Sequence, residues 1–212
     1  MKKSTKKKII LIAGGTGGHV YPAISLSENL LKDPTKEVYY LTDKRGKKYF
    51  DQVESSFLYQ INSSSPYRKS RKETFLFPFK IFSGFIKSLV ILRRISPSVI
   101  IAFGGYTSIP PCLAGYILRI PIIIHEQNAI MGTSNKALKR FSKLIFLGFS
   151  INEPVTKKMM LVGNPIKKLN KNSSLNRKQE SLRVYITGGS QGSEFINQNI
   201  PIALNVLEIP LE

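Results

Sequence analysis

The sequence predicts an α/β protein built on a doubly wound parallel sheet. Short apolar runs alternate along the chain with longer stretches of helical periodicity, which is typical of βαβ units. The first apolar run ends in a glycine-rich turn that leads into a helix, as doubly wound folds begin. With 212 residues, of which 42% are apolar and 21% are charged, the chain has the composition of a globular protein.

The individual elements follow from these patterns in chain order. We expect strands at residues 8–13, 38–42, 57–61, 99–103, 121–124, 144–147, 159–162 and 183–187. Between and after them we expect helices at residues 22–31, 79–94, 109–118, 135–141 and 194–207. The first helix is placed at Pro22 because proline lacks the N–H group that the first helical position leaves unpaired.

A polar segment rich in Lys, Asn and Ser predicts a domain boundary near the end of the chain. We expect a basic tail at 1–8, an N-terminal Rossmann-like domain at 9–166, a linker at 167–181 and the start of a second such domain at 182–212. This last part offers one strand, one glycine-rich loop and one helix, which is too little to bury an apolar face alone. The second domain is therefore expected to be incomplete.

The charge balance predicts anionic partners. Lys and Arg number 32 against 13 Asp and Glu, for a net charge of +19, which suits phosphates, nucleic acid or an anionic membrane. No nucleic-acid-binding motif accompanies the charge, so we expect no nucleic acid. The single cysteine, Cys112, indicates a reducing compartment. The apolar run at 9–13 is too short for a signal peptide, and Lys80 and Lys87 interrupt the apolar segment 75–92, so a cytoplasmic protein is expected.

Three glycine-rich loops each follow an expected strand, at residues 14–19, 103–108 and 187–193. Glycines allow close approach to a ligand, and the N-terminus of the following helix favours an anion such as a diphosphate. Any one of these loops is equally consistent with a simple turn. Three strand–glycine–helix junctions in one chain indicate that an anion-binding device is repeated.

A nicotinamide oxidoreductase is an alternative for the first loop. A dinucleotide fingerprint that starts at Gly15 needs a third glycine where Val20 stands. Asp43, at the end of the second expected strand, has the residue type and place of the acid that binds ribose. The oxidoreductase hypothesis therefore depends on Asp43 and one loop, and it leaves the later motifs unexplained.

Four polar residues in a row, His125, Glu126, Gln127 and Asn128, follow the expected strand at 121–124. Open α/β sheets bind ligands at the carboxyl ends of their strands. A capped turn with Asn128 as the N-cap is the alternative. The density of polar groups at this place favours a ligand site.

Five motifs together resemble the MurG family of bacterial N-acetylglucosaminyltransferases. They lie at residues 14–23, 104–106, 125–128, 163–165 and 188–192, and the resemblance runs from Ile9 to about Pro201. It implies a GT-B fold, in which two Rossmann-like domains face each other. It also implies inverting transfer of N-acetylglucosamine from UDP-GlcNAc to lipid I, which forms lipid II in peptidoglycan synthesis. A non-catalytic protein that binds the lipid-diphosphate acceptor, or a scaffold, is the alternative.

The resemblance also implies roles for individual residues. His19 would be the catalytic base, with loop ordering or phosphate contact as the alternative. The residues implied for UDP-GlcNAc are Thr16, Gly17, Gly18, Asn128, Lys167, Ser190 and Gln191. Those implied for the acceptor diphosphate and lipid side are Gly15, Gly104, Gly105, Tyr106 and Glu126. Lys167 stands where the family usually has arginine, so the charge is kept and the bidentate fork is lost.

No metal and no other cofactor are expected, since the family lacks a metal-binding acidic pair and His19 and His125 form no recognisable ligand set. The lipid acceptor implies peripheral binding at the cytoplasmic face of the inner membrane, with other cell-wall synthesis proteins as partners. The aromatic and basic segment at 75–94 is expected to contact anionic lipid. The contact residues expected are Phe75, Phe79, Phe82, Phe85, Lys80 and Lys87.

The helix at 79–94 is also expected to pack on the sheet. Phe79, Phe82, Ile86 and Leu89 recur at helical spacing and predict the inward stripe, while Phe85 falls off it. A crossover helix that is buried on both sides is the alternative to membrane contact.

Overall fold

The computed structural model describes residues 6–63, 71–152, 154–167, 184–188 and 192–206, with only the backbone described at 71–76. Contacts divide the chain into two compact units, Met1–Lys167 and Lys168–Glu212. The roles expected for the segments of the chain stay predictions.

The first unit is built on a sheet of seven parallel strands in the order β3-β2-β1-β4-β5-β6-β7. The strands are β1 (Lys7–Ile12), β2 (Lys36–Thr42), β3 (Leu58–Gln60), β4 (Val99–Ala102), β5 (Ile122–Glu126), β6 (Leu144–Leu147) and β7 (Met159–Leu161). The α/β class with a parallel sheet is therefore confirmed. The order reverses between β1 and β4, and such a switch point opens a crevice at the carboxyl ends of the strands.

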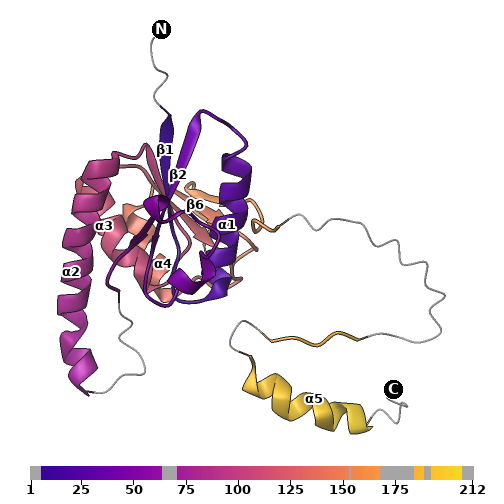
Figure 1. The fold of residues 1–212 in the computed structure, drawn as a ribbon. Helices are drawn as coiled ribbons and strands as arrows, with labels where there is room; N and C mark the ends of the chain where they lie inside the picture. Colours follow the sequence, from indigo (N-terminus) through magenta and orange to yellow (C-terminus); the bar gives the residue numbers. More distant parts are fainter. Residues whose placement is uncertain (1–5, 64–70, 153, 168–183, 189–191, 207–212) are drawn as a thin grey trace. The chain divides into compact units, whose positions relative to one another are not determined.

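Helices cover both faces of this sheet. Figure 1 shows α1 (Gly17–Leu30) on one side, and α2 (Arg71–Ile95) and α3 (Ile109–Ile117) on the other. The short helix α4 (Thr133–Leu138) follows β5, and single 3-10 turns lie at Lys47–Tyr49, Ser55–Phe57, Tyr106–Ser108 and Lys139–Phe141. Successive side chains of a strand point to opposite faces. Leu11 of β1 therefore packs with Val20 of α1, and Ile10 and Ile12 pack with the core under α2 and α3.

Helix α1 begins at Gly17, within the glycine run, so the start expected at Pro22 is wrong. The N–H groups of His19 and Val20 both donate to the Thr16 carbonyl, at 3.2 and 3.3 Å. Val20 is fully buried. Its packing and these two hydrogen bonds together contribute more stability than the one backbone hydrogen bond that Pro22 removes. The consequence is that the side chain of His19 is carried by a helix and not by a loop.

Helix α2 turns a different face to the sheet from the one that its apolar spacing predicts. Phe79, Phe82 and Ile86 are 63%, 64% and 44% exposed, so the inward stripe expected for these three is wrong. Leu89 packs against the core as expected, and Phe85 packs there with it. Membrane contact by Phe85 therefore has no support in this packing.

Small side chains determine which face of α2 points inward. A Cβ atom on Gly84 would clash with the backbone carbonyl oxygen of Asn62. Ser88 is fully buried, and its hydroxyl donates to the Gly84 carbonyl at 2.6 Å. Only residues of this size allow such close approach, so the larger aromatic side chains at 79 and 82 face away. None of the described helices is both long and apolar enough to span a bilayer.

The second unit contains helix α5 (Glu194–Val206), which has no buried residue among those described. The helix expected at 194–207 is thereby confirmed. Residues 184–188 form no strand, so the strand expected at 183–187 is wrong over its described part. A β-strand is defined by hydrogen bonds to a neighbouring strand, and no described residue of the second unit supplies such a partner strand.

The buried thiol of Cys112 gives a probe of this fold. Burial raises the pKa of Cys112 to about 12, and the side chain is fully inaccessible. Because the thiolate is the reactive form, we expect iodoacetamide to leave the folded chain unlabelled at pH 8 and to modify it in guanidinium chloride. Intact mass spectrometry checks both states, and labelling of the folded chain at the rate of a free thiol would contradict the packing.

Candidate functional site

A cavity of about 380 Å³ lies at the carboxyl edge of the sheet, where the loops after β1, β4 and β5 meet. Its position is the crevice that the strand order predicts. The residues that line it are Gly14, Gly15, Thr16, His19, Arg45, Gly104, Gly105, Tyr106, Thr107, Glu126, Asn128, Gly132, Thr133, Ser134 and Asn135. Almost all of these groups are polar or backbone, which suits a hydrophilic ligand.

The first glycine turn is fixed by Asp43. The Asp43 carboxylate accepts hydrogen bonds from the backbone N–H groups of Gly15 and Gly46, at 2.9 and 2.7 Å. A Cβ atom on Gly14 would lie 2.6 Å from Thr107 Oγ1 and 2.9 Å from Asp43 Oδ1, so only glycine fits there. The acid that the oxidoreductase hypothesis assigns to ribose is thus used to hold the loop.

The second glycine turn depends on left-handed backbone. Gly104 and Gly105 have φ of 88° and 72°, which strains any residue with a side chain. The Ser108 hydroxyl donates to the Gly104 carbonyl at 2.7 Å. A Cβ on Gly105 would approach His19 Nε2 to 3.6 Å. The conformation therefore brings bare backbone up to the imidazole.

Glu126 organises the loop that follows β5. It is 1% exposed, and its Oε1 accepts from the backbone N–H and the side-chain amide of Asn128, both at 3.0 Å. Its Oε2 accepts from the N–H of Gly132 at 2.9 Å and from Asn135 Nδ2 at 2.7 Å. Four donors satisfy this buried carboxylate, which balances the cost of desolvating its charge. One side chain thus holds three residues of the cavity wall.

His19 and His125 are linked through the amide of Gln127. His19 Nδ1 lies 3.1 Å from Gln127 Oε1, and Gln127 Nε2 lies 3.0 Å from His125 Nδ1. His125 is buried, and its Nε2 lies 3.1 Å from the carbonyl oxygen of Gly163. Only His19 of the two histidines faces the cavity.

The structure brings together most of the residues that the sequence singles out for the site. Those that line the cavity are Gly15, Thr16, His19, Gly104, Gly105, Tyr106, Glu126 and Asn128. Gly17 and Gly18 lie in the first turn of α1 and do not line it. Lys167 is exposed at the end of the first unit. Ser190 and Gln191 lie outside the described residues, so their expected roles stay predictions.

Arg45, Thr107 and Asn135 also line the cavity, although the sequence did not single them out as site residues. Arg45 was missed because it lies beyond the end of β2, outside any motif. Asn135 is 2% exposed, and its Oδ1 has no hydrogen-bond partner in the described part of the chain. A buried acceptor without a donor is costly.

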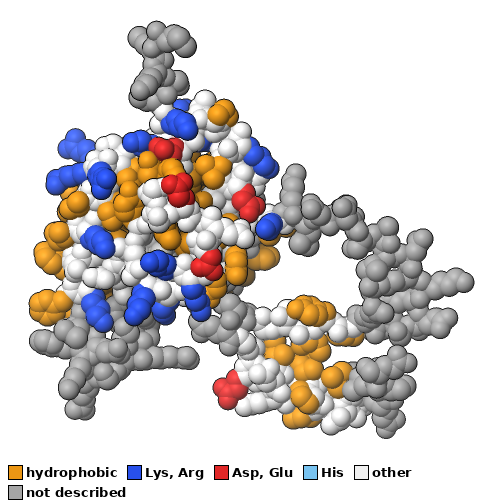
Figure 2. All heavy atoms as spheres, viewed as in Figure 1, with side chains coloured by type: hydrophobic (Ala, Val, Ile, Leu, Met, Phe, Trp, Pro, Cys, Tyr) orange, Lys and Arg blue, Asp and Glu red, His pale blue; other side chains and the backbone are white. Residues whose placement is uncertain are grey.

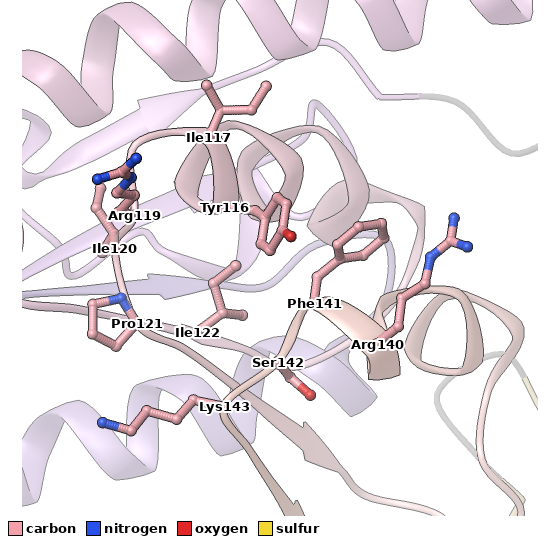
Figure 3. A pocket seen from close by; sticks show the side chains of 10 residues that line it. All are labelled: Tyr116, Ile117, Arg119, Ile120, Pro121, Ile122, Arg140, Phe141, Ser142 and Lys143. Atoms are coloured by element: carbon pink, nitrogen blue, oxygen red, sulfur yellow. The ribbon is translucent and has the colours of Figure 1, made fainter.

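A second cavity, of about 660 Å³, lies at the amino ends of strands β5 and β6, between the end of α3 and the start of β6. Figure 3 shows the rings of Tyr116 and Phe141 close together in it, with Arg119, Arg140 and Lys143 around them. The ring centroids are 5.0 Å apart, and the Arg140 guanidinium lies 4.7 Å from the Phe141 centroid. No carboxylate lines this cavity, so it is a basic and aromatic surface.

No group of three or more His, Cys, Asp or Glu side chains within the described ranges is placed to hold a metal ion.

His125 makes folding sensitive to pH. Burial lowers the pKa of His125, against the opposing effect of the Gly163 carbonyl. Below the ordinary value of about 6.5, the unfolded chain therefore binds a proton that the folded chain does not. We expect the free energy of unfolding to fall as the pH drops below about 6.5, by at most about 1.4 kcal/mol per pH unit from this group. Urea unfolding between pH 7.5 and 5 measures it, and a His125→Gln variant with the same slope would contradict it.

Comparison with known proteins identifies the family. Residues 9–147 match the glycosyltransferase family 28 N-terminal domain. A protein of Francisella tularensis subsp. holarctica named UDP-N-acetylglucosamine–N-acetylmuramyl-(pentapeptide) pyrophosphoryl-undecaprenol N-acetylglucosamine transferase is 36% identical over 206 residues. The match covers 92% of this chain and 55% of that protein. The protein of the same name from Rickettsia canadensis is also 36% identical, over 95% of this chain and 57% of its own length.

Among solved structures, the crystal structure of Acinetobacter baumannii MurG matches with a TM-score of 0.70 at 28% identity, over 97% of this chain and 57% of that one. The chain thus spans about half the length of the relatives it matches. The GT-B fold class expected from the sequence is confirmed by these matches. The family match covers most of the chain, and the chain accordingly belongs to glycosyltransferase family 28.

Proposed function

We propose that this chain serves the transfer of N-acetylglucosamine from UDP-GlcNAc to the N-acetylmuramyl sugar of a pentapeptide pyrophosphoryl-undecaprenol, which converts lipid I to lipid II. The name of the relatives supports this substrate pair. The observation that carries the proposal is the cavity, in which an imidazole on α1 faces two glycine turns at the switch point of a family 28 sheet. A base next to anion-binding backbone is what glycosyl transfer to a lipid diphosphate needs.

In the proposed reaction, the acceptor hydroxyl attacks the anomeric carbon of N-acetylglucosamine. A new glycosidic C–O bond forms as the bond from that carbon to the diphosphate oxygen breaks, and the electron pair leaves with UDP. His19 takes the proton of the hydroxyl. Inversion follows because the hydroxyl attacks the face opposite the leaving diphosphate.

The remaining cavity residues are assigned to substrate contacts in the same proposal. The acceptor diphosphate would lie against Gly15, Gly104, Gly105 and Tyr106, where glycine backbone permits close approach and the nearby Arg45 favours an anion. Glu126 would act indirectly, since both its oxygens already accept hydrogen bonds.

The donor contacts belong to the proposal as well. Thr16 and Asn128 would face UDP-GlcNAc from the cavity wall, and Gly17 and Gly18 would offer N–H groups of the first turn of α1. Lys167, Ser190 and Gln191 would complete the donor site. A lysine in place of a bidentate arginine makes a weaker diphosphate contact at 167.

A lipid acceptor places the reaction at the cytoplasmic face of the inner membrane, where other cell-wall synthesis proteins would be neighbours. The surface proposed to contact the membrane is the exposed apolar face of α2, formed by Phe79, Phe82, Ile86 and Val90. Their spacing keeps them on one side of the helix. Figure 2 shows hydrophobic side chains along the edge where α2 runs in Figure 1, with Lys and Arg side chains near them.

Basic side chains flank this apolar face of α2. Lys87, Arg93 and Arg94 are exposed on the same helix, and Lys80 is half-buried. Helix α3 lies beside α2, and its last turn adds the exposed Tyr116 and Ile117 next to the basic cavity of Figure 3. Apolar side chains bordered by cations favour peripheral binding to anionic lipid.

The test uses the chain with lipid I in mixed micelles and UDP-GlcNAc labelled in the sugar. We expect labelled lipid II, and we expect His19→Ala to reduce the rate by about 10²- to 10⁴-fold, the usual range for a general base. Tyr21→Phe, an exposed change on the same helix, is the matched control and should leave the rate unchanged. Acceptor binding without transfer would favour the non-catalytic alternative, and absence of acceptor binding would overturn the proposal.

A further inference from the structure

A chain of hydrogen-bonding groups runs from the cavity into the core of the first unit. It starts at His19 Nδ1, passes through the carboxamide of Gln127 and the ring of His125, and ends on the carbonyl oxygen of Gly163. Every heavy-atom distance along it is 3.0 or 3.1 Å. The direction of each hydrogen bond in this chain follows from the groups at its ends.

Two backbone carbonyls determine the direction, since a carbonyl oxygen only accepts hydrogen bonds. His125 Nε2 faces the Gly163 carbonyl, so Nε2 carries the proton and Nδ1 of the neutral ring is an acceptor. Gln127 Nε2 lies 2.9 Å from the carbonyl oxygen of His125 and also faces His125 Nδ1. Both are acceptors, so the amide nitrogen must lie on this side. The oxygen of the Gln127 amide must then face His19.

The Gln127 oxygen determines which ring nitrogen of His19 carries a proton. An amide oxygen cannot donate, so His19 Nδ1 must carry a proton to pair with Gln127 Oε1 at 3.1 Å. A neutral imidazole has one N–H, which leaves a lone pair on Nε2. The Nε2 atom is on the cavity side, near the bare backbone of Gly105. The free lone pair is thus at the atom that a substrate can reach.

We infer that Gln127 is a positioning residue that holds His19 in the tautomer with the proton on Nδ1, so that Nε2 faces the cavity as the acceptor of a proton. This inference rests on the proposed function, in which His19 takes the proton of the acceptor hydroxyl. A free imidazole favours the opposite tautomer, in which Nε2 carries the proton and has no basic lone pair. Gln127 and its fixed partners therefore select the productive form of the ring.

Burial makes this selection stable. Gln127 is 8% exposed and His125 is 3% exposed, so water competes little for their hydrogen bonds. The backbone carbonyl of Gln127 accepts from Asn164 Nδ2 at 3.1 Å, which ties the same residue to the segment after β7. Rotation of the amide would place its nitrogen against the His19 N–H and its oxygen against the carbonyl of His125. Both contacts would be repulsive, so the observed orientation is the only satisfied one.

The test is long-range 15N–1H NMR of the folded chain labelled at histidine, in the pH range where His19 is neutral. The downfield signal of an unprotonated ring nitrogen is expected at Nε2 of His19 and at Nδ1 of His125. In Gln127→Leu, the downfield signal of His19 is expected to move largely to Nδ1. Gln52→Leu, an exposed change outside the site, is the matched control and should preserve the unaltered pattern. Alkylation of Cys112 reports whether each variant is folded, and Gln127→Asn replaces Gln127→Leu if that variant is not.

Each outcome has a separate meaning. A proton on Nε2 of His19 in the unaltered chain, or an unchanged tautomer in a folded Gln127→Leu chain, would overturn the inference whatever the activity. A tautomer change in Gln127→Leu, together with full transfer activity of His19→Ala, would leave the positioning role intact and reject His19 as the base. If both hold, Gln127→Leu should lower kcat for transfer and leave KM for UDP-GlcNAc nearly unchanged.

Discussion

Glu126→Ala should lower the free energy of unfolding of the first unit by about 3–5 kcal/mol. The substitution removes the acceptor of four hydrogen bonds, which come from Asn128, Gly132 and the buried Asn135. A hydrogen bond to a charged group contributes about 1.5–3 kcal/mol, and an orphaned buried donor adds its own desolvation cost. Since domains are stable by only about 5–15 kcal/mol, this is a large share of the total. Urea unfolding, monitored through the alkylation of Cys112, measures this loss of stability.

Two further variants make the result specific. Glu28→Ala removes an exposed carboxylate from α1 and should change the stability by less than about 0.5 kcal/mol. Glu126→Gln keeps one acceptor oxygen and replaces the other by an NH2 group that faces existing donors. Its loss of stability should therefore lie between those of Glu28→Ala and Glu126→Ala. A loss below about 1 kcal/mol for Glu126→Ala would show that the loop does not depend on this carboxylate.

The same hydrogen bonds show why the sequence predicted the place of the site but not its internal organisation. Short apolar strands and glycine turns are local signals, and they brought Gly15, Gly105 and Glu126 to one edge of the sheet as expected. The sequence treated Glu126 as a ligand contact. Its use as the acceptor for residues up to nine positions further along the chain depends on the path of the loop, which no local pattern encodes.

Arg45 illustrates a related limit. It lies beyond the end of β2, in a segment without a motif, and enters the cavity because Asp43 and the first glycine turn hold β2 and β1 together there. Such a residue becomes a candidate only once the strand order is known. The prediction that α1 starts at Pro22 failed for a different reason. Proline is common at the first position of helices, but here the helix already begins within the glycine run that precedes it.

Helix α2 is the clearest case in which tertiary packing overrides a pattern. The apolar spacing predicts that the face with the aromatic residues is buried. The structure instead buries the face with Gly84 and Ser88, because small residues permit closer contact. The exchange of faces has a functional consequence. Phe79 and Phe82 are exposed and lie outside the core cluster, whereas Phe85 packs against it.

Replacing Phe82 and Ile86 together by serine should weaken binding to anionic vesicles by about 30-fold. Full burial of such a side chain is worth about 1.5–3 kcal/mol, and a helix lying at the interface buries only part of it. About 1 kcal/mol from each gives a combined loss of about 2 kcal/mol, and 1.4 kcal/mol corresponds to a factor of ten. Sedimentation with vesicles of phosphatidylglycerol and phosphatidylethanolamine gives the partition coefficients.

The control for this variant comes from the other side of the sheet. Tyr21 and Leu31 lie on or next to α1 and are 59% and 53% exposed, so their double serine variant removes comparable apolar surface without altering the face of α2. It should bind vesicles as the unaltered chain does. Lys87→Glu with Arg94→Glu should also weaken binding, by an amount that shrinks at high salt, because each cation near an anionic surface contributes about 1 kcal/mol. Equal losses in the α1 and α2 serine variants would mean that binding follows general apolarity, and the face of α2 would then have no special part in it.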